Sequence, residues 1–309
     1  MPPTLPVPLY LLGERYRQGR AVQRNRRKSQ LAVLEKFSLS ETGKGEGRVL
    51  FILGSGESVL SLQESQWSYV SGQASIGIGA WTLHPFVPDF LALEHIEYSP
   101  ERDGYSESET GLERSYREAL EGWYTRSEVQ KRQPRILFFR PPKIGDLSRL
   151  APLGDYWAEH TLLYGRISSS SRTMSGLERE LKHYLRLVKA GIIPFFLPFD
   201  TGASLIRLIC LGALSGYRNI VLAGVDLRDS RFFWEADHSF LAERRVSRFI
   251  TSENGVMHST ETMGALPVSD SLRVVSRTLS QSLGTKLTVA HSSSWVASFL
   301  PVFDWARVS

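Results

Sequence analysis

Short, uninterrupted apolar runs that alternate with segments of helical periodicity constrain the fold of this 309-residue chain most strongly. The runs at 49–53 (VLFIL) and 219–224 (NIVLAG) are too short for helices and are typical of strands buried on both faces. Strands alternating with helices predict an α/β fold with a doubly wound, mostly parallel sheet. The other predicted strands are 74–79, 90–95, 136–139, 161–164, 192–197 and 286–290. The predicted helices are 112–126, 177–189, 202–214 and 295–300, with one more that ends near 66. A last helix is predicted to have Ser269 or Asp270 as its N-cap and to end near 283.

Two segments fall outside this alternation. Residues 1–46 carry seven Lys and Arg residues and no acid between positions 15 and 28, so we expect a basic N-terminal arm before a domain at 47–309. Such an arm suits an anionic membrane surface, although a solvated arm without a partner explains it as well. Tyr16 is the one aromatic residue among these cations, and we therefore predict no nucleic-acid binding. The aromatic and charged stretch at about 227–266 lacks a long period and is predicted to be an irregular lid.

Composition narrows the classes further. The net charge of +5 suits an anionic ligand such as a nucleotide sugar, or is a chance surface balance. The single cysteine, Cys210, lies in an apolar run and excludes an internal disulfide and a cysteine-based zinc site. No apolar run reaches the roughly 18 residues of a transmembrane helix, and the first 20 residues do not fit a signal peptide. We expect a cytoplasmic protein that is at most peripheral at the inner membrane.

The loop after the first strand carries the first chemical signature. It reads LGSGES at 53–58, and a glycine turn between a strand and a helix presents backbone N–H groups to a phosphate or carboxylate. Val59 occupies the place of the third glycine of a dinucleotide fingerprint, and no P-loop lysine follows. Gly54, Ser55 and Gly56 are therefore candidate anion-binding residues, and a tight turn that needs small residues is the alternative.

Three further segments carry polar groups at or near predicted strand ends. Thr201 and Gly202 open an apolar helix, where Thr201 is a ligand-binding hydroxyl or, more simply, a helix cap. Asp226 follows a buried strand at the carboxyl edge, where its carboxylate could hold ribose hydroxyls and Arg228 could neutralise phosphate oxygens. The alternative is a turn aspartate with exposed cations nearby. His258 lies in the predicted lid and could take a proton from a sugar hydroxyl near neutral pH.

Several chemistries are missing from the sequence. There is no DxD triplet to bridge a metal and a nucleotide sugar, no GxSxG elbow and no HExxH helix. The second strand runs into Gly-Ile-Gly-Ala-Trp at 77–81 and offers no acid for the ribose of a methyl donor, which disfavours a methyltransferase.

The four segments, in this order, resemble those of the small bacterial sialyltransferases. That family has a glycine–Asn–glycine loop after strand one, a Thr-Ser-Gly turn into a helix, a strand running into Gly-Ile-Asp, and a histidine–serine pair in the lid. The counterparts here are Gly54-Ser55-Gly56, Asp200-Thr201-Gly202, Gly224-Val225-Asp226 and His258-Ser259, and the likeness covers roughly residues 48–300.

The resemblance implies a single Rossmann-like domain of the GT-A type that uses a CMP-activated sugar, inverts the anomeric carbon, and needs no metal and no cofactor. It implies that His258 is the general base on the acceptor hydroxyl. Members of the family often form homo-oligomers. By the same likeness, the residues that hold CMP are Gly54, Ser55, Gly56, Thr201, Gly202 and Asp226.

The chain also departs from the family pattern. Two family tyrosines on the departing phosphate match Arg228, which gives a stronger charge-assisted bond, and Trp234, which gives only its indole N–H. Ser55 replaces the loop asparagine, and Glu94 stands where the family has an asparagine after strand three. Other acidic sugars that travel on CMP (Kdo, legionaminic or pseudaminic acid) therefore fit as well as sialic acid, with a glycan or glycolipid as acceptor in lipopolysaccharide or capsule synthesis.

Two other functions remain open at this point. A pyrophosphokinase-type phosphoryl transferase has a similar glycine loop and a late strand that ends in aspartate, and it would need ATP and magnesium. A non-catalytic nucleotide- or glycan-binding protein of a surface assembly would bind CMP and turn over no CMP-sugar.

Overall fold

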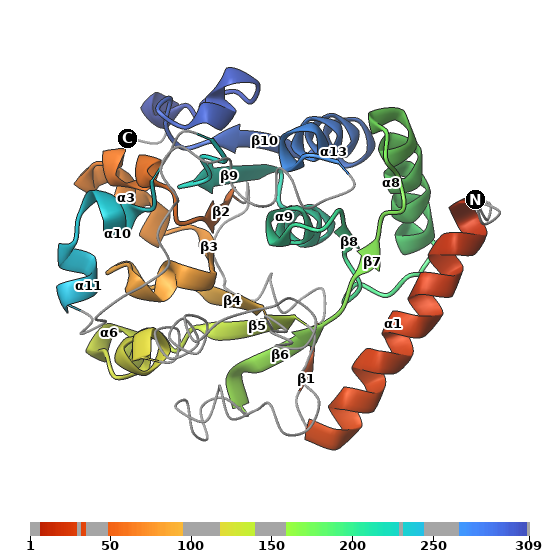
Figure 1. Ribbon diagram of the computed structural model, residues 1–309, viewed down its shortest axis with the longest axis horizontal. Coiled ribbons are helices and arrows are strands. Elements are labelled where there is room, and N and C mark those ends of the chain that lie inside the picture. The colour runs from red at the N-terminus through yellow and green to blue at the C-terminus, as the bar shows by residue number, and fades with distance from the viewer. Residues whose placement is uncertain are drawn as a thin grey trace, which may run out of the picture.

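An eight-stranded sheet, parallel in every pairing, runs through the centre of the protein (Figure 1). The computed structural model describes residues 7–29, 32–34, 49–94, 118–139, 159–228, 231–243 and 266–307. The strand order β1-β6-β5-β4-β3-β2-β9-β10 confirms the predicted doubly wound parallel sheet. Its strands are β1 (Ala32–Val33), β2 (Val49–Leu53), β3 (Ala74–Ile78), β4 (Phe90–Glu94), β5 (Arg135–Phe139), β6 (Thr161–Tyr164), β9 (Asn219–Ala223) and β10 (Lys286–Val289). A separate two-stranded sheet pairs β7 (Ile167–Ser168) with β8 (Phe199–Asp200).

Helices cover both faces of the sheet (Figure 1). One face carries α8 (Met174–Lys189), α9 (Ser204–Leu214) and α13 (Val268–Leu283). The other carries α3 (Glu64–Ser71), α6 (Ser127–Arg132), α10 (Phe233–Ala236) and α11 (Ser239–Glu243). Residues 118–124 are also helical. The described residues also form the 3₁₀ segments η1 (Glu57–Ser61), η2 (Gly79–Leu83), η5 (Trp295–Ser298) and η6 (Trp305–Arg307).

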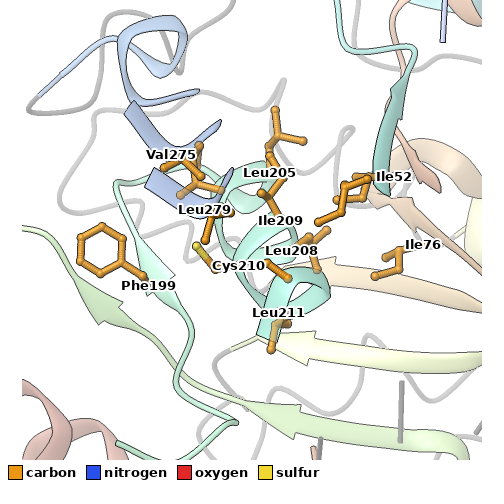
Figure 2. Close-up of a cluster of buried hydrophobic side chains, with 14 of the residues drawn as sticks. Ile52, Ile76, Phe199, Leu205, Leu208, Ile209, Cys210, Leu211, Val275 and Leu279 are labelled. Atoms are coloured by element: carbon orange, nitrogen blue, oxygen red, sulfur yellow. The ribbon is translucent and has the colours of Figure 1, made fainter. Parts of the chain in front are cut away.

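The alternation of side chains along β2 explains its uninterrupted apolar sequence. Leu50 and Ile52 belong to the hydrophobic cluster under α8, α9 and α13, whereas Phe51 and Leu53 belong to the cluster under α3 and α10. A strand covered on both faces needs apolar residues at every position. The helix α9 is buried in the same way, and Figure 2 shows its side chains directed toward the strands and toward α13.

Two sequence-based expectations on this face were wrong. Residues 192–197 form turns rather than a strand, and only the two residues of β8 pair after them. Pro194 and Pro198 lack the N–H that a strand interior needs, which explains the break. Likewise α13 begins at Val268 with Pro267 before it, so neither Ser269 nor Asp270 is its N-cap.

The N-terminal segment forms a helix that was not among the predicted ones. The helix α1 (Val7–Ser29) packs against β7 and α8, and β1 pairs with β6 at the sheet edge. Leu11 and Val22 are buried in the main core, although residues 1–46 were expected to form an arm. Pro8 falls in the first turn, where the missing N–H costs nothing. Among the helices described, none has the length and apolar character to cross a membrane.

Candidate functional site

The order of the strands reverses between β2 and β9. From β2 the chain continues to β3, β4, β5 and β6 on one side, and it returns to β9 and β10 on the other. Open α/β sheets bind ligands outside the carboxyl ends of their strands at such a switch point. Residues 54–58 leave β2 there and residues 224–228 leave β9, so the topology brings together two segments that the sequence singles out.

Gly54 and Gly224 approach each other backbone to backbone. The Gly54 N–H donates to the Ala223 carbonyl at 2.7 Å, and the Gly56 N–H donates to the Gly224 carbonyl at 2.7 Å. A Cβ on Gly54 would lie 2.5 Å from the Gly224 oxygen, and a Cβ on Gly224 would lie 2.3 Å from the Gly54 oxygen. Gly224 also has a φ of +66°, which side chains rarely allow. Glycine is therefore required at both positions, because the segments that follow β2 and β9 contact each other there.

Most backbone N–H groups of the glycine loop donate to other residues of the protein. This differs from the expectation that the loop presents its N–H groups to a phosphate or carboxylate. Besides the two glycine bonds, the Glu57 N–H donates to the Arg231 carbonyl at 2.9 Å, and the Ser58 N–H donates to Asp226 Oδ2 at 2.9 Å. The 3₁₀ turn η1 follows in place of an α-helix. Within the described part of the chain, no hydrogen bond occupies the Ser55 N–H. Ser55 is therefore the loop residue that has a backbone donor to offer a ligand.

Asp226 is the buried acid of the switch point, with 4 % of its surface exposed. Its Oδ2 accepts the Ser58 N–H, and a Cβ on Gly56 would lie 2.4 Å from this oxygen. Its Oδ1 is buried and has no hydrogen-bond partner among the residues that the structure describes. Burial raises the pKa of Asp226, while the nearby Ser58 and Ser294 lower it in part. Since an unsatisfied buried acceptor costs free energy, a hydroxyl from a ligand would be favourable here.

A strained turn carries the chain from Asp226 to Arg228. Leu227 has a φ of +63°, and the Arg228 N–H donates to the Asp226 carbonyl at 2.8 Å, as in a γ-turn of positive φ. Strain of this kind persists only where the surroundings enforce it, and it is frequent at functional sites. The turn holds the Arg228 guanidinium over the Trp295 ring, 4.4 Å from the ring centroid. A fixed positive charge thus lies two residues from the buried acid.

Trp234 packs in the interior, with 1 % of its surface exposed. Its ring stacks on Phe232 at a centroid distance of 4.5 Å and an interplanar angle of 12°. The Phe233 N–H donates to the Ser55 carbonyl at 3.0 Å, and Phe232 forms an antiparallel bridge with Gly56. The segment that carries Trp234 therefore also holds the glycine loop in place.

The turn at Asp200 differs from the expected helix cap. The Gly202 N–H donates to Asp200 Oδ1 at 2.9 Å, and Gly202 has a φ of +102°. The helix α9 begins at Ser204, with Ala203 as its N-cap and no side-chain cap. The prediction that Thr201 caps this helix was wrong, because the Asp200 side chain closes the turn instead. Thr201 is half-buried beside this turn.

Two predicted site residues are placed only in part. Glu94 ends β4, which is separated from β2 by β3, and its side chain lies outside the described part of the structure. His258 also lies outside the described residues, as do 229–230 and 244–265 of the predicted lid. The described part of that segment forms α10 and α11.

Sequence reasoning missed the contribution of the segment after β10. The Ser294 hydroxyl donates to the Val225 carbonyl at 2.7 Å, and Trp295 stacks under Arg228. Ser294 is also the N-cap of η5, where its side chain accepts a hydrogen bond from the Val296 N–H. A serine placed to cap a helix after the last strand is the sequence signal that could have identified this segment. In the described ranges, no group of three or more His, Cys, Asp and Glu side chains could hold a metal ion.

Comparison with known proteins gives structural likeness without sequence matches. No protein-family model matches the chain, and no curated protein matches it. Among solved structures, the sialyltransferase CST-II in complex with CMP is similar over 82 % of this chain and 86 % of its own, at 13 % identity and a TM-score of 0.40. An alpha-2,3-sialyltransferase from Campylobacter jejuni in apo form matches over 83 % and 80 %, at 12 % identity and a TM-score of 0.37. Monomeric CstII matches over 82 % and 86 %, also at 12 % and 0.37.

Proposed function

We propose that this protein is an inverting glycosyltransferase that moves a sialic-acid-like sugar from a CMP donor to a glycan acceptor without a metal. The observation that carries the proposal is the buried Oδ1 of Asp226 at the switch point, which has no hydrogen-bond partner among the described residues. The same two segments that leave β2 and β9 also carry the Ser55 N–H and the Arg228 cation. A nucleoside monophosphate supplies what these groups lack, because its ribose hydroxyls donate to a carboxylate and its phosphate accepts from an arginine and an N–H. The cytosine base and the acidic sugar are part of the proposal because the four sequence segments resemble those of the small bacterial sialyltransferases.

In this proposal the phosphate of CMP is the leaving group. Negative charge develops on its oxygens as the bond to the anomeric carbon breaks, and Arg228 and the Ser55 N–H stabilise that charge. Donors that are fixed before the reaction are the most effective, and the stacking on Trp295 holds the guanidinium in place. His258 removes the proton of the acceptor hydroxyl. The hydroxyl oxygen attacks the anomeric carbon from the face opposite the departing phosphate, which inverts the configuration at that carbon.

Isothermal titration calorimetry with CMP tests the proposal. We expect CMP to bind equally with magnesium and with EDTA, and UDP and S-adenosylmethionine to bind far more weakly. Asp226→Asn should weaken CMP binding about tenfold or more, because a hydrogen bond to a charged acceptor is lost. Asp304→Asn is the matched control, since Asp304 is an exposed acid paired with Arg307 at the C-terminal end.

The same titrations distinguish the alternatives. Binding of ATP with magnesium but not of CMP would favour a pyrophosphokinase. Binding of CMP without turnover of any of the four acidic CMP-sugars would favour a non-catalytic nucleotide-binding protein. Either result would overturn the transferase proposal.

A further inference from the structure

A turn follows the last strand, β10, and folds back over the exit of β9. We call residues 291–295 the β10 turn. Its Ser294 hydroxyl donates to the Val225 carbonyl at 2.7 Å, and the Ser61 and Ser293 hydroxyl oxygens lie 3.5 Å apart. Ser61 ends η1, which follows the glycine loop, and Val225 belongs to the segment that leaves β9. The β10 turn therefore contacts both segments that form the switch point.

Ser294 connects the β10 turn to Asp226. Only 5 % of the Ser294 surface is exposed, and its hydroxyl accepts the Val296 N–H at 3.2 Å in addition to donating to the Val225 carbonyl. The Ser294 side chain is also close enough to the Asp226 carboxylate to lower its pKa. A serine hydroxyl carries one proton. Because the Val225 carbonyl accepts this proton, Ser294 fixes the peptide that precedes Asp226 without donating to Asp226 Oδ1.

Trp295, the next residue, connects the same turn to Arg228. The Arg228 guanidinium lies over the indole ring, 4.4 Å from its centroid. Phe299 packs against this ring at a centroid distance of 5.5 Å and an interplanar angle of 71°, so the ring is itself held in place. Stacking engages the face of a guanidinium, whereas an anion binds to the N–H groups in its plane. Trp295 can therefore fix the direction of the Arg228 fork while the fork binds a phosphate.

We infer that Ser294 and Trp295 are positioning residues of the nucleotide site, which orient the two charged groups of the switch point. Ser294 orients Asp226 toward the ribose hydroxyls, and Trp295 orients Arg228 toward the phosphate. The inference rests on the proposed function for the identity of the ligand. Because each residue serves a different part of that ligand, binding of CMP and of cytidine, which lacks the phosphate, separates the two roles.

Ser294→Ala tests the contact with the ribose-binding acid. We expect it to weaken the binding of both CMP and cytidine about tenfold, because the hydrogen bond that holds the peptide before Asp226 is lost. It should also raise the pKa of Asp226, so that CMP affinity begins to fall at a higher pH than in the wild type as the solution is acidified. Ser294→Thr, which keeps the hydroxyl, should restore both properties. Ser293→Ala is the matched control, since Ser293 is exposed in the same turn and bonds to His291.

Trp295→Leu tests the contact with the phosphate-binding cation. We expect it to weaken CMP binding about tenfold and to leave cytidine binding within twofold, because Arg228 acts on the phosphate. Trp295→Phe keeps an aromatic face and should retain most of the CMP affinity. The double variant Arg228→Lys/Trp295→Leu should bind CMP no worse than the weaker single variant, since both changes act through one cation. Trp305→Leu is the matched control, because Trp305 stacks on Phe51 and should affect stability alone.

The two roles can be refuted separately. Cytidine binding as tight as that of the wild type, or an unchanged pKa of Asp226, in Ser294→Ala would overturn the role of Ser294. Equal losses for CMP and cytidine in Trp295→Leu, or no loss, would overturn the role of Trp295.

Measurements on the free protein distinguish a failure of the proposed function from a failure of the positioning roles. If the wild-type protein binds neither CMP nor cytidine, the proposed function fails. An NMR titration of the Asp226 carboxyl group then decides the role of Ser294, and urea unfolding of the Arg228 and Trp295 single and double variants decides that of Trp295. A pKa raised by Ser294→Ala and non-additive effects on stability would support the two roles. An equal pKa and additive effects would overturn them.

Discussion

The Asp226 carboxylate accepts the backbone N–H of Ser58 at 2.9 Å, from 168 positions further along the chain. This bond joins the loop after β2 to the exit of β9, at the point where the strand order reverses. It occupies one carboxylate oxygen and leaves the other for a ligand. The small size of Gly56 makes the bond possible, because a side chain there would displace the carboxylate. The integrity of the site therefore depends on this close approach.

Replacing Gly56 by alanine should damage both folding and binding. Its Cβ would lie 2.4 Å from Asp226 Oδ2, so the loop or the carboxylate must move. We expect Gly56→Ala to destabilise the protein by about 1–3 kcal/mol and to abolish measurable CMP binding. Urea unfolding and calorimetry measure the two effects. Gly13→Ala is the control, since no atom lies within 4 Å of its Cβ position and alanine in a helix interior adds about 0.5–1 kcal/mol. A Gly56→Ala protein as stable as the wild type would contradict the close approach.

The raised pKa of Asp226 makes stability depend on pH in a defined direction. Burial favours the protonated form in the folded state, so ionisation favours the unfolded chain. The stabilising contribution is fully present below the ordinary pKa of aspartate and is lost as pH rises through the raised value. We expect Asp226→Asn to be more stable than the wild type at pH 7 and equally stable at pH 3, while it loses CMP affinity. Urea unfolding between pH 3 and pH 8 checks this. A variant less stable than the wild type at pH 7 would show that the charge is needed for folding.

The stacked guanidinium of Arg228 should act on the phosphate of the ligand. Lysine keeps the charge but not the planar fork or the stacking, so we expect Arg228→Lys to weaken CMP binding about tenfold. Cytidine lacks the phosphate and should bind the variant as it binds the wild type. Arg273→Lys is the control, because Arg273 makes a similar contact with Phe299, 3.9 Å from the ring centroid, on α13. An equal loss for cytidine and CMP would assign Arg228 to another part of the ligand.

The strands of the sheet were predictable because a strand that is buried on both faces has an uninterrupted apolar sequence. Residues 49–53 are apolar at each position, and β2 has these bounds. Local patterns failed where backbone chemistry overrides them. The apolar run at 192–197 contains Pro194 and turns instead of pairing. The polar α1 also escaped notice, since only a few of its residues, such as Leu11, reach the core.

The site was predictable in its components and not in their contacts. The sequence identified Asp226 and the glycine loop, because both follow buried strands. It gave no sign that the loop donates its N–H groups to the exit of β9, since that depends on which strands are neighbours. The same limit applies to Trp295 under Arg228 and to Ser294 beside Asp226, whose partners are distant in sequence.

The basic helix α1 should bind anionic membranes. Arg15, Arg20 and Tyr16 are exposed, so their charge and aromatic ring are available to a surface. We expect binding to vesicles that contain phosphatidylglycerol and none to vesicles of phosphatidylcholine alone. Binding should be lost at about 0.5 M salt, because salt screens the attraction between exposed charges. Replacing Arg15 and Arg20 by glutamine should weaken binding by about 1 kcal/mol per charge in a sedimentation assay. Equal binding to neutral vesicles would refute an electrostatic contact.

His258→Ala should remove the general base and spare the nucleotide site. We expect transfer to fall by about 10²–10⁴-fold, while the Kd of CMP stays within twofold, because the base acts on the acceptor hydroxyl. The wild-type rate should rise from acidic to neutral pH as the imidazole loses its proton, and the variant should lack this rise. His238→Ala is the control, since His238 is an exposed histidine at the start of α11. Retention of transfer in His258→Ala, with the pH dependence intact, would mean that another group takes the acceptor proton. His291 would then be the residue to test, because it follows β10 at the same edge of the sheet, with Nδ1 2.7 Å from the Ser293 hydroxyl.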